Sequence, residues 1–204
     1  MPRIQTLPRA ELSELEKGFA ATEARMGFVP NSMLTMAHRP EIAQAFSTMA
    51  NAILGPGAVP RELKNMISQV CSRAAGCAYC MAHTAHTAGR LGVGDAKEAA
   101  LWEYETSPFY NEAERAALRV AQGAGQVPNA VTDADFAALK KHFSDDQIVE
   151  IVAVISLFGY LNRWNDTMAT ELEASPLEAG RKFLSPKGWT EGKHGSGPGT
   201  KAAE

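Results

Sequence analysis

The spacing of the apolar residues constrains the fold of this chain more than any other feature. Between residues 60 and 75 the apolar residues recur at intervals of three and four, which places them on one face of a helix. The same periodicity occurs in most segments between glycines and prolines, and no long run alternates with a period of two. The pattern predicts an all-α protein, folded as a bundle of many helices.

Glycines, prolines and N-cap residues set the expected helix boundaries. The expected helices span residues 9–24, 32–37, 40–53, 60–75, 77–90, 96–104, 112–124, 133–142, 145–168 and 176–183. The helix after Ser144 is apolar on nearly every side as far as Leu161, which is typical of a central, buried helix. We expect one helical domain over residues 1–184 and a flexible tail over residues 185–204, because the end of the chain is rich in glycine and polar residues.

The composition argues against several classes of protein. Hydrophobic residues make up 45% of the sequence, and the formal net charge of −3 gives no sign of a nucleic acid or an anionic membrane as partner. The longest apolar run, from Ile148 to Leu161, is too short to span a bilayer, and the first residues resemble no secretory signal. Three cysteines, an odd number, do not suit a secreted disulfide framework. We therefore expect a cytoplasmic protein.

The segment around Cys77 and Cys80 carries the clearest chemical signal. Two cysteines three residues apart at the start of a helix lie about 60° apart around its axis, so their sulfurs can approach within disulfide reach. A thiolate attacks a peroxide O–O bond to form a sulfenic acid, which a second thiol resolves as a disulfide. His83 is placed to move the proton. From the helix dipole alone, Cys77 is the expected nucleophile.

Glu150 and Arg163 are further candidates for a functional role. Glu150 lies in the most apolar helix, where burial would raise the pKa of a carboxyl group and make it an acid or base. It could instead pair with Arg163, Arg73 or a backbone donor for structural reasons, and Arg163 could equally hold a carboxylate substrate.

A metal site and a role for the third cysteine are less favoured by the spacing. The series Cys77, Cys80, His83 and His86 spirals around one helix, so we expect no metal site there. The third cysteine, Cys71, lies on a buried stripe and is expected to be inert.

The run SRAAGCAYCMAHTAH resembles the core of the carboxymuconolactone decarboxylase/alkyl hydroperoxidase D (AhpD-like) superfamily, in particular its peroxidase-related members. The stretches Gly27–Asn31, Ser107–Phe109 and Leu161–Asn165 also resemble that group, so the resemblance covers most of residues 27–173. It implies an all-α AhpD-like fold, homo-oligomers that are often trimers or hexamers, and reduction of a hydroperoxide without a bound cofactor. A dithiol or a protein reductant would restore the cysteines.

The resemblance also implies roles for individual residues, with two departures from the family pattern. Cys80 would attack the peroxide and Cys77 would resolve, which reverses the assignment from the helix dipole. The family's usual histidine position is Thr84 here and its usual glutamate position is Asn65, so His83 and Glu150 are the expected substitutes. The predicted catalytic set is therefore Cys80, Cys77, His83 and Glu150.

Two other functions remain open from the sequence. One is a lyase or isomerase that acts on a lactone-type acid, although that branch of the family generally lacks the cysteine pair. The other is a redox-sensing protein whose oligomeric state follows the Cys77–Cys80 disulfide.

Overall fold

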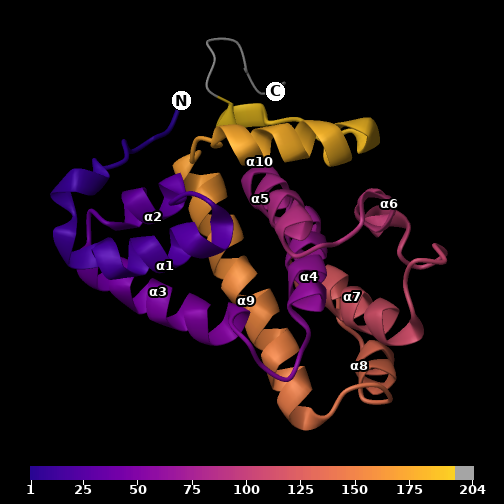
Figure 1. Cartoon of the computed structure of the whole chain (residues 1–204). Coiled ribbons are helices and arrows are strands. Elements are labelled where there is room, and N and C mark those ends of the chain that lie inside the picture. The colour runs from indigo at the N-terminus through magenta and orange to yellow at the C-terminus, as the bar shows by residue number, and fades with distance from the viewer. Residues whose placement is uncertain (196–204) are drawn as a thin grey trace.

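The computed structural model describes residues 1–195, and these contain helices and turns but no strand. The prediction of an all-α fold is confirmed. The described residues form ten α-helices, which Figure 1 labels: α1 (Glu16–Met26), α2 (Asn31–Met36), α3 (Pro40–Leu54), α4 (Arg61–Ala74), α5 (Ala78–Arg90), α6 (Asp95–Ala99), α7 (Glu112–Ala124), α8 (Asp133–Leu139), α9 (Asp145–Met168) and α10 (Ala174–Ala179).

Capping residues explain why α7 and α9 begin where the sequence predicted. Asn111 accepts the backbone N–H of Glu114 at 2.9 Å, and the Glu114 side chain accepts the N–H of Asn111 at 3.0 Å. At the start of α9 the Gln147 side chain accepts the N–H of Ser144 at 3.0 Å. Each pair satisfies N–H groups that a helix start leaves without a partner.

Two segments depart from the predicted helices. Residues 9–15 form two short 3₁₀ turns before α1, and α6 ends at Ala99, ahead of a separate 3₁₀ turn at Leu101–Glu103. Periodicity could not separate such turns from an α-helix, because both repeat apolar residues at about three-residue intervals.

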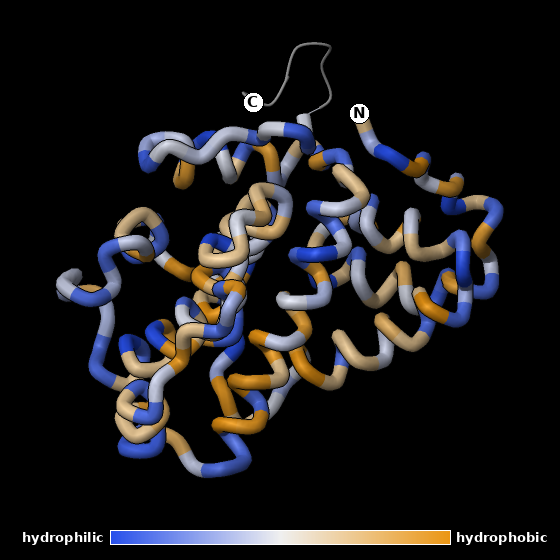
Figure 2. Tube along the Cα trace, turned by 180° about the vertical axis from the view of Figure 1, so that it is seen from behind, coloured by the Kyte–Doolittle hydropathy of each residue, from blue (hydrophilic) through white to orange (hydrophobic). Residues whose placement is uncertain are grey.

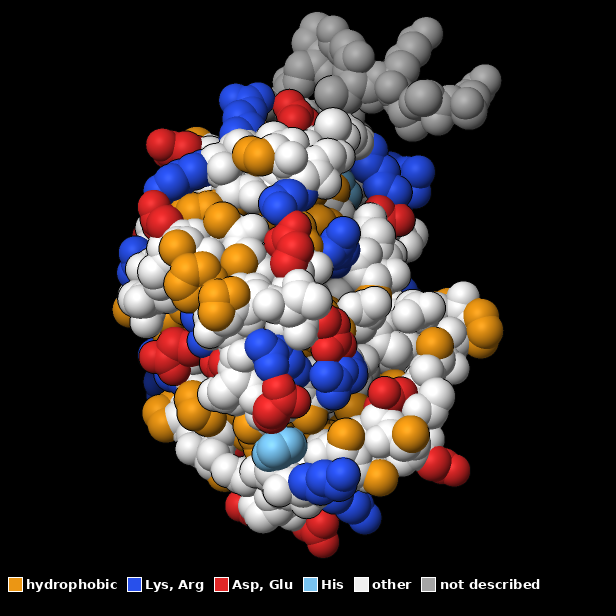
Figure 3. All heavy atoms as spheres, turned by 90° about the vertical axis from the view of Figure 1, so that its right-hand side faces the viewer, with side chains coloured by type: hydrophobic (Ala, Val, Ile, Leu, Met, Phe, Trp, Pro, Cys, Tyr) orange, Lys and Arg blue, Asp and Glu red, His pale blue; other side chains and the backbone are white. Residues whose placement is uncertain are grey.

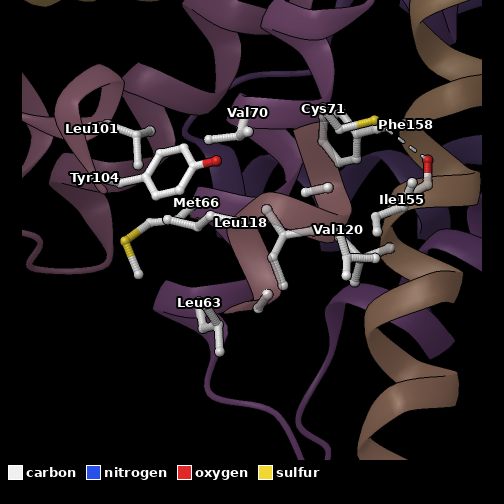
Figure 4. Close-up of a cluster of buried hydrophobic side chains, with 14 of the residues drawn as sticks. Leu63, Met66, Val70, Cys71, Leu101, Tyr104, Leu118, Val120, Ile155 and Phe158 are labelled. Atoms are coloured by element: carbon white, nitrogen blue, oxygen red, sulfur yellow. Dashed lines mark hydrogen bonds between the residues drawn. The ribbon is translucent and has the colours of Figure 1, made fainter. Parts of the chain in front are cut away.

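The central helix is α4 rather than α9. Every residue of α4 from Leu63 to Ser72 is buried, and the helix packs against α5, α7 and α9. Figure 4 shows the apolar side chains gathered there, including Met66, Val70 and Leu118. By contrast, α9 exposes Val149 and Val152. Apolar residues cover more than one face of α9 because the helix packs against two groups of helices.

The helix α9 lies between two apolar clusters. The larger cluster holds α4, α5 and α7, and the smaller one packs α1, α2 and α3 against α9 through Leu157. Figure 1 shows α1, α2 and α3 on one side of α9 and α4 and α7 on the other. Figure 2 shows hydrophilic residues along the outer loops and hydrophobic residues on stretches of the inner helices. The two clusters enclose the pocket described below.

The surface carries mixed charge. Figure 3 shows basic and acidic side chains interspersed on one face, with small groups of hydrophobic side chains between them. Within residues 1–195 no helix has both the length and the apolar character that crossing a bilayer requires.

The segment after residue 184 differs from the predicted flexible tail as far as the structure describes it. Trp189 is buried and its indole N–H donates to the carbonyl of Ala78 at 3.1 Å. His194 is also buried, and its Nδ1 lies 2.7 Å from the carbonyl oxygen of Thr170. The remainder of the predicted tail, 196–204, lies outside the described residues. The glycine-rich composition predicted a flexible segment, but the buried side chain of Trp189 packs the segment against the start of α5.

Candidate active site

A tight turn brings the two cysteines to the start of α5. Gly76 follows α4 with a φ of 74°, a conformation open to glycine but strained for other residues. Cys77 is then the N-cap residue of α5, and its Sγ accepts the backbone N–H of Cys80 at 3.4 Å. The two side chains therefore lie one turn apart where the helix dipole favours negative charge.

Cys80, and not Cys77, lines the apolar pocket at the start of α5. Both side chains are buried, with exposed fractions of 0% for Cys77 and 2% for Cys80. Cys80 contributes to a pocket of about 120 Å³ with mainly apolar walls, to which Met33, Phe46 and Phe158 also contribute. A small molecule in this pocket would contact Cys80 and not Cys77.

Asn165 of α9 contacts the Cys80 sulfur and lines the same pocket. Its Nδ2 donates to Cys80 Sγ at 3.4 Å. Burial raises the pKa of the Cys80 thiol well above its usual range, and the neighbouring Cys77 raises it further, whereas the Asn165 hydrogen bond lowers it. The balance leaves Cys80 a neutral thiol at neutral pH, with one amide N–H already placed to stabilise the thiolate.

A hydrogen bond joins His83 to a carboxylate that was not predicted from the sequence. His83 lines the same pocket as Cys80, and its Nε2 lies 2.6 Å from Oε2 of Glu173. Glu173 stands in the connection between α9 and α10 and also accepts the backbone N–H of Asn31 at 2.5 Å. The pair thus ties α5, α2 and the start of α10 together beside the pocket.

The Glu173 carboxylate is ionised and fixes the tautomer of His83. Burial alone would raise the pKa of Glu173, but the charge and hydrogen bond of His83, together with the Asn31 N–H, lower it below its usual value. An ionised carboxylate only accepts hydrogen bonds, so His83 Nε2 carries the hydrogen and Nδ1 is left for other partners. His83 can therefore exchange a proton through Nδ1.

Tyr79 completes this arrangement. Its hydroxyl donates to Glu173 Oε1 at 2.9 Å, and its ring stacks on the His83 imidazole with centroids 4.1 Å apart. Burial and the Glu173 charge raise the pKa of Tyr79, so its hydroxyl stays protonated. Tyr79 and Glu173 hold the imidazole in one orientation.

The two positions that depart from the family pattern contact each other. Asn65 Nδ2 donates to the carbonyl of Thr84 at 3.0 Å, and the Thr84 hydroxyl donates to the carbonyl of Cys80 at 2.9 Å. Both side chains line the Cys80 pocket. This part of the wall is therefore neutral, and the ionised carboxylate next to the pocket is that of Glu173.

The structure places Glu150 in a different environment from Cys80. Its carboxylate forms an ion pair with Lys64 and accepts the backbone N–H of Val59 at 2.8 Å, and it does not line the Cys80 pocket. Burial would raise the pKa of Glu150, but the Lys64 and Val59 hydrogen bonds lower it. The expectation of a raised pKa is therefore wrong, and these contacts match the structural alternative.

The other sequence candidates also lie outside the pocket. Arg163 donates to the carbonyl of Gly159 at 3.0 Å on its own helix and lines a separate groove with Cys71. His86 contacts the carbonyl of Met26 at 3.0 Å. In the described part of the chain, no three His, Cys, Asp or Glu side chains lie together as a metal site would require.

Asn165, which contacts Cys80, and Glu173, which contacts His83, were the site residues hardest to predict because both come from distant parts of the sequence. Asn165 belongs to a polar cluster at the end of α9 that the sequence marked, but nothing in the sequence linked it to Cys80, 85 residues earlier. The only signal for Glu173 was its place at the end of the stretch that resembles the family.

Comparison with known proteins places the chain in a family. Residues 40–123 match the model of the carboxymuconolactone decarboxylase family. A similar solved structure is that of a cysteine-to-alanine variant of debrominase Bmp8 in complex with 2,3,4-tribromopyrrole. The sequence identity is 38% and the TM-score is 0.85, and the alignment covers 88% of this chain and 96% of that one. The chain belongs to the carboxymuconolactone decarboxylase/AhpD-like superfamily.

More distant relatives agree with this placement. An uncharacterised peroxidase-related protein from Ralstonia eutropha JMP134, described as an alkylhydroperoxidase AhpD core, is 26% identical with a TM-score of 0.75 over 86% of this chain and 94% of that one. The uncharacterised protein YnjA of Escherichia coli K12 is 33% identical over 103 residues. That match covers 50% of this chain and about half, 54%, of YnjA.

Proposed function

We propose that this protein is a dithiol oxidoreductase that reduces a small organic hydroperoxide, with Cys80 as the attacking residue and Cys77 as the resolving one. The observation that carries the proposal is the position of the pair. Cys80 lines an apolar pocket, and Cys77 lies behind it at the helix start, with its sulfur 3.4 Å from the Cys80 backbone nitrogen. The family placement supports the same chemistry.

The proposed reaction is a two-electron reduction in two steps. The Cys80 thiolate attacks the outer peroxide oxygen, the O–O bond breaks, and the alcohol leaves after it takes up a proton. Cys80 is then a sulfenic acid, which the Cys77 thiolate attacks, so that an S–S bond forms and the hydroxyl group leaves as water once protonated. A dithiol reductant returns both cysteines to thiols and is itself oxidised to a disulfide.

His83 is the proposed proton carrier. As a general base it takes the proton of the Cys80 thiol, and as a general acid it then gives a proton to the leaving alkoxide. Glu173 and Tyr79 act as positioning residues, since both contact His83; Tyr79 also lines the pocket, whereas Glu173 does not.

Cysteine variants test this proposal. Reduced wild-type protein mixed with cumene hydroperoxide should lose the thiols of Cys77 and Cys80 and gain one intramolecular disulfide, detected by peptide mass spectrometry. Cys80→Ser should lose the reaction, and Cys77→Ser should stop at a sulfenic acid that dimedone traps. Cys71→Ser serves as the matched control and should behave as wild type. Undiminished peroxide reduction by Cys80→Ser would refute the assignment.

A second candidate reaction is reductive dehalogenation of a small aromatic compound. The debrominase complex favours it, because that relative shares 38% identity with this chain and holds a brominated pyrrole. The pocket of about 120 Å³ is also close to the roughly 150 Å³ apolar cavity that accepts benzene in another protein. The dithiol would supply the same two electrons: the aryl halide becomes an arene and a halide ion, and the two thiols become a disulfide.

Halide release distinguishes the two candidates. Incubation of the reduced protein with 2,3,4-tribromopyrrole, followed by ion chromatography, measures bromide directly. Bromide in proportion to the disulfide formed, with no reaction toward hydroperoxides, would replace the first candidate with the second.

A further inference from the structure

The wall of the Cys80 pocket also contains two charged residues that the proposed reaction does not use. Besides the buried Cys80, the pocket is lined by Arg25 of α1 and Arg61 of α4. Arg61 is exposed and Arg25 is half-buried, whereas Cys80 is 2% exposed, so the lining extends from a buried sulfur to residues at the surface. Apolar surface forms most of the rest of the wall.

The two arginines lack the acidic partners that such side chains usually have. Within residues 1–195 no carboxylate oxygen lies within 4.0 Å of either guanidinium group. Arg25 donates to the Asn51 side chain at 3.2 Å, which is a neutral acceptor. Burial, and secondly the charge of Arg61, lower the pKa of Arg25. Two like charges thus lie close together beside an apolar pocket.

The third cation of the pocket is already neutralised. Lys64 is buried and pairs with Glu150, and its Nζ also donates to the carbonyls of Ile53 and Gly55, each at 2.8 Å. It has no capacity left for a ligand, because an ammonium group donates three hydrogen bonds. The free positive charge of the pocket is therefore confined to Arg25 and Arg61.

We propose that Arg25 and Arg61 bind the carboxylate of the substrate, and that the substrate is a small organic acid whose apolar end reaches Cys80. A guanidinium fork matches a carboxylate with two hydrogen bonds, and an anion between the two arginines offsets their mutual repulsion. An apolar group of about the size of one aromatic ring would then occupy the pocket between the carboxylate and Cys80. The identity of the reacting group at Cys80 rests on the proposed function, whereas the anion site does not.

Binding of sodium benzoate tests the anion site without any redox step. Isothermal titration calorimetry with the reduced protein should show that benzoate binds and that uncharged benzamide binds at least about tenfold more weakly, as loss of charged hydrogen bonds implies. Arg61→Gln should weaken benzoate binding about tenfold and leave benzamide unaffected. Arg25→Lys should retain part of the affinity, because it keeps the charge but loses the fork.

Two controls make the result decisive. Arg39→Gln removes the same charge at an exposed position outside the pocket, beside Glu41, and should bind benzoate as wild type. Inorganic phosphate carries charge without an apolar body and should bind more weakly than benzoate. Equal binding of benzoate and benzamide, or an effect of Arg39→Gln as large as that of Arg61→Gln, would overturn the proposal.

Kinetics separate this inference from the proposed reaction. The rate of Cys80 oxidation is compared for cumene hydroperoxide and its para-carboxylate derivative, in wild type and in Arg61→Gln. A preference for the carboxylate that disappears in Arg61→Gln supports both the inference and the proposed reaction. Reaction with both peroxides at equal rates overturns the anion site alone. Benzoate binding that depends on Arg61, without reaction toward either peroxide, supports the anion site and overturns the hydroperoxide assignment.

Discussion

The Cys80 thiol lies where burial opposes the charged form that the proposed chemistry requires. Burial and Cys77 raise the pKa of Cys80, and the N–H of Asn165 offsets only part of this. In the proposed reaction, Cys80 would therefore start as a thiol and form the thiolate when its proton passes to His83.

We expect alkylation of Cys80 by iodoacetamide to accelerate with pH beyond the ordinary thiol value of 9.0, because only the thiolate reacts. Below the raised pKa, each pH unit increases the thiolate fraction about tenfold. Site-resolved mass spectrometry measures the rate. A plateau below pH 8 would contradict the raised pKa.

Glu173→Gln should slow hydroperoxide reduction by about tenfold, as loss of a partner that orients a reacting histidine commonly does. The same variant should leave the alkylation rate of Cys80 unchanged at high pH, where hydroxide deprotonates the thiol and neither His83 nor a proton on a leaving oxygen is needed. A general structural defect would change both rates. Glu171→Gln, two residues earlier, is the matched control and should keep the wild-type rate.

At the level of the elements, the ion pair of Lys64 in α4 and Glu150 in α9 joins the central helix to the helix between the two apolar clusters. Glu150→Gln should lower the free energy of unfolding by about 3 kcal/mol, because it leaves the buried Lys64 without its counter-charge. Urea unfolding measures the loss. Cys80 oxidation at a temperature where the variant is folded should remain near wild type, and a strong loss there would restore Glu150 as a catalytic candidate.

Glu98 of α6 makes stability depend on pH. It is buried against Gln69 of α4, whose Nε2 donates to it at 2.6 Å, and burial raises its pKa from 4.5 to about 7. The folded state therefore holds a proton that the unfolded state releases, and stability is lost as the pH rises from about 4.5 to about 7. The loss amounts to about 3 kcal/mol.

Glu98→Gln imitates the protonated carboxyl group and should remove this dependence. Unfolding in urea between pH 5 and pH 8 should show a decline for wild type and a flat curve for the variant. The exposed Glu14→Gln is the control and should decline as wild type. Parallel curves for wild type and Glu98→Gln would show that another group titrates.

Local signals explain which elements the sequence predicted well. The starts of α7 and α9 are as predicted, because capping side chains lie within three residues of the backbone they satisfy. The cysteine pair is likewise local. Glu173 and Asn165 reach the site from distant segments, and only the packing of α9 and α10 against α5 brings them there.

For the whole molecule, Leu157 tests whether the two apolar clusters fold together. It lies on α9, in the smaller cluster with Phe19, Met36 and Phe46. Leu157→Ala should cost about 2–5 kcal/mol by the cavity it leaves. Circular dichroism and tryptophan fluorescence should still report one coincident urea transition. Separate transitions for the two probes would show that the layer of α1–α3 unfolds independently.

The relation between the layers could not be read from the sequence. Periodicity predicted that α9 was buried on nearly every side, but did not show that different partners bury its two sides. That is a property of the packing of remote segments, and it determines where the pocket forms.

The pocket draws part of its wall from outside the residues that match the family model. The match, 40–123, contains both cysteines, His83 and Arg61, whereas Arg25, Met33 and Phe158 lie before or after it. Substitutions in these flanking segments would change which molecule fits beside Cys80 and leave the cysteine motif intact. Two proteins with identical cysteine motifs therefore need not share a substrate.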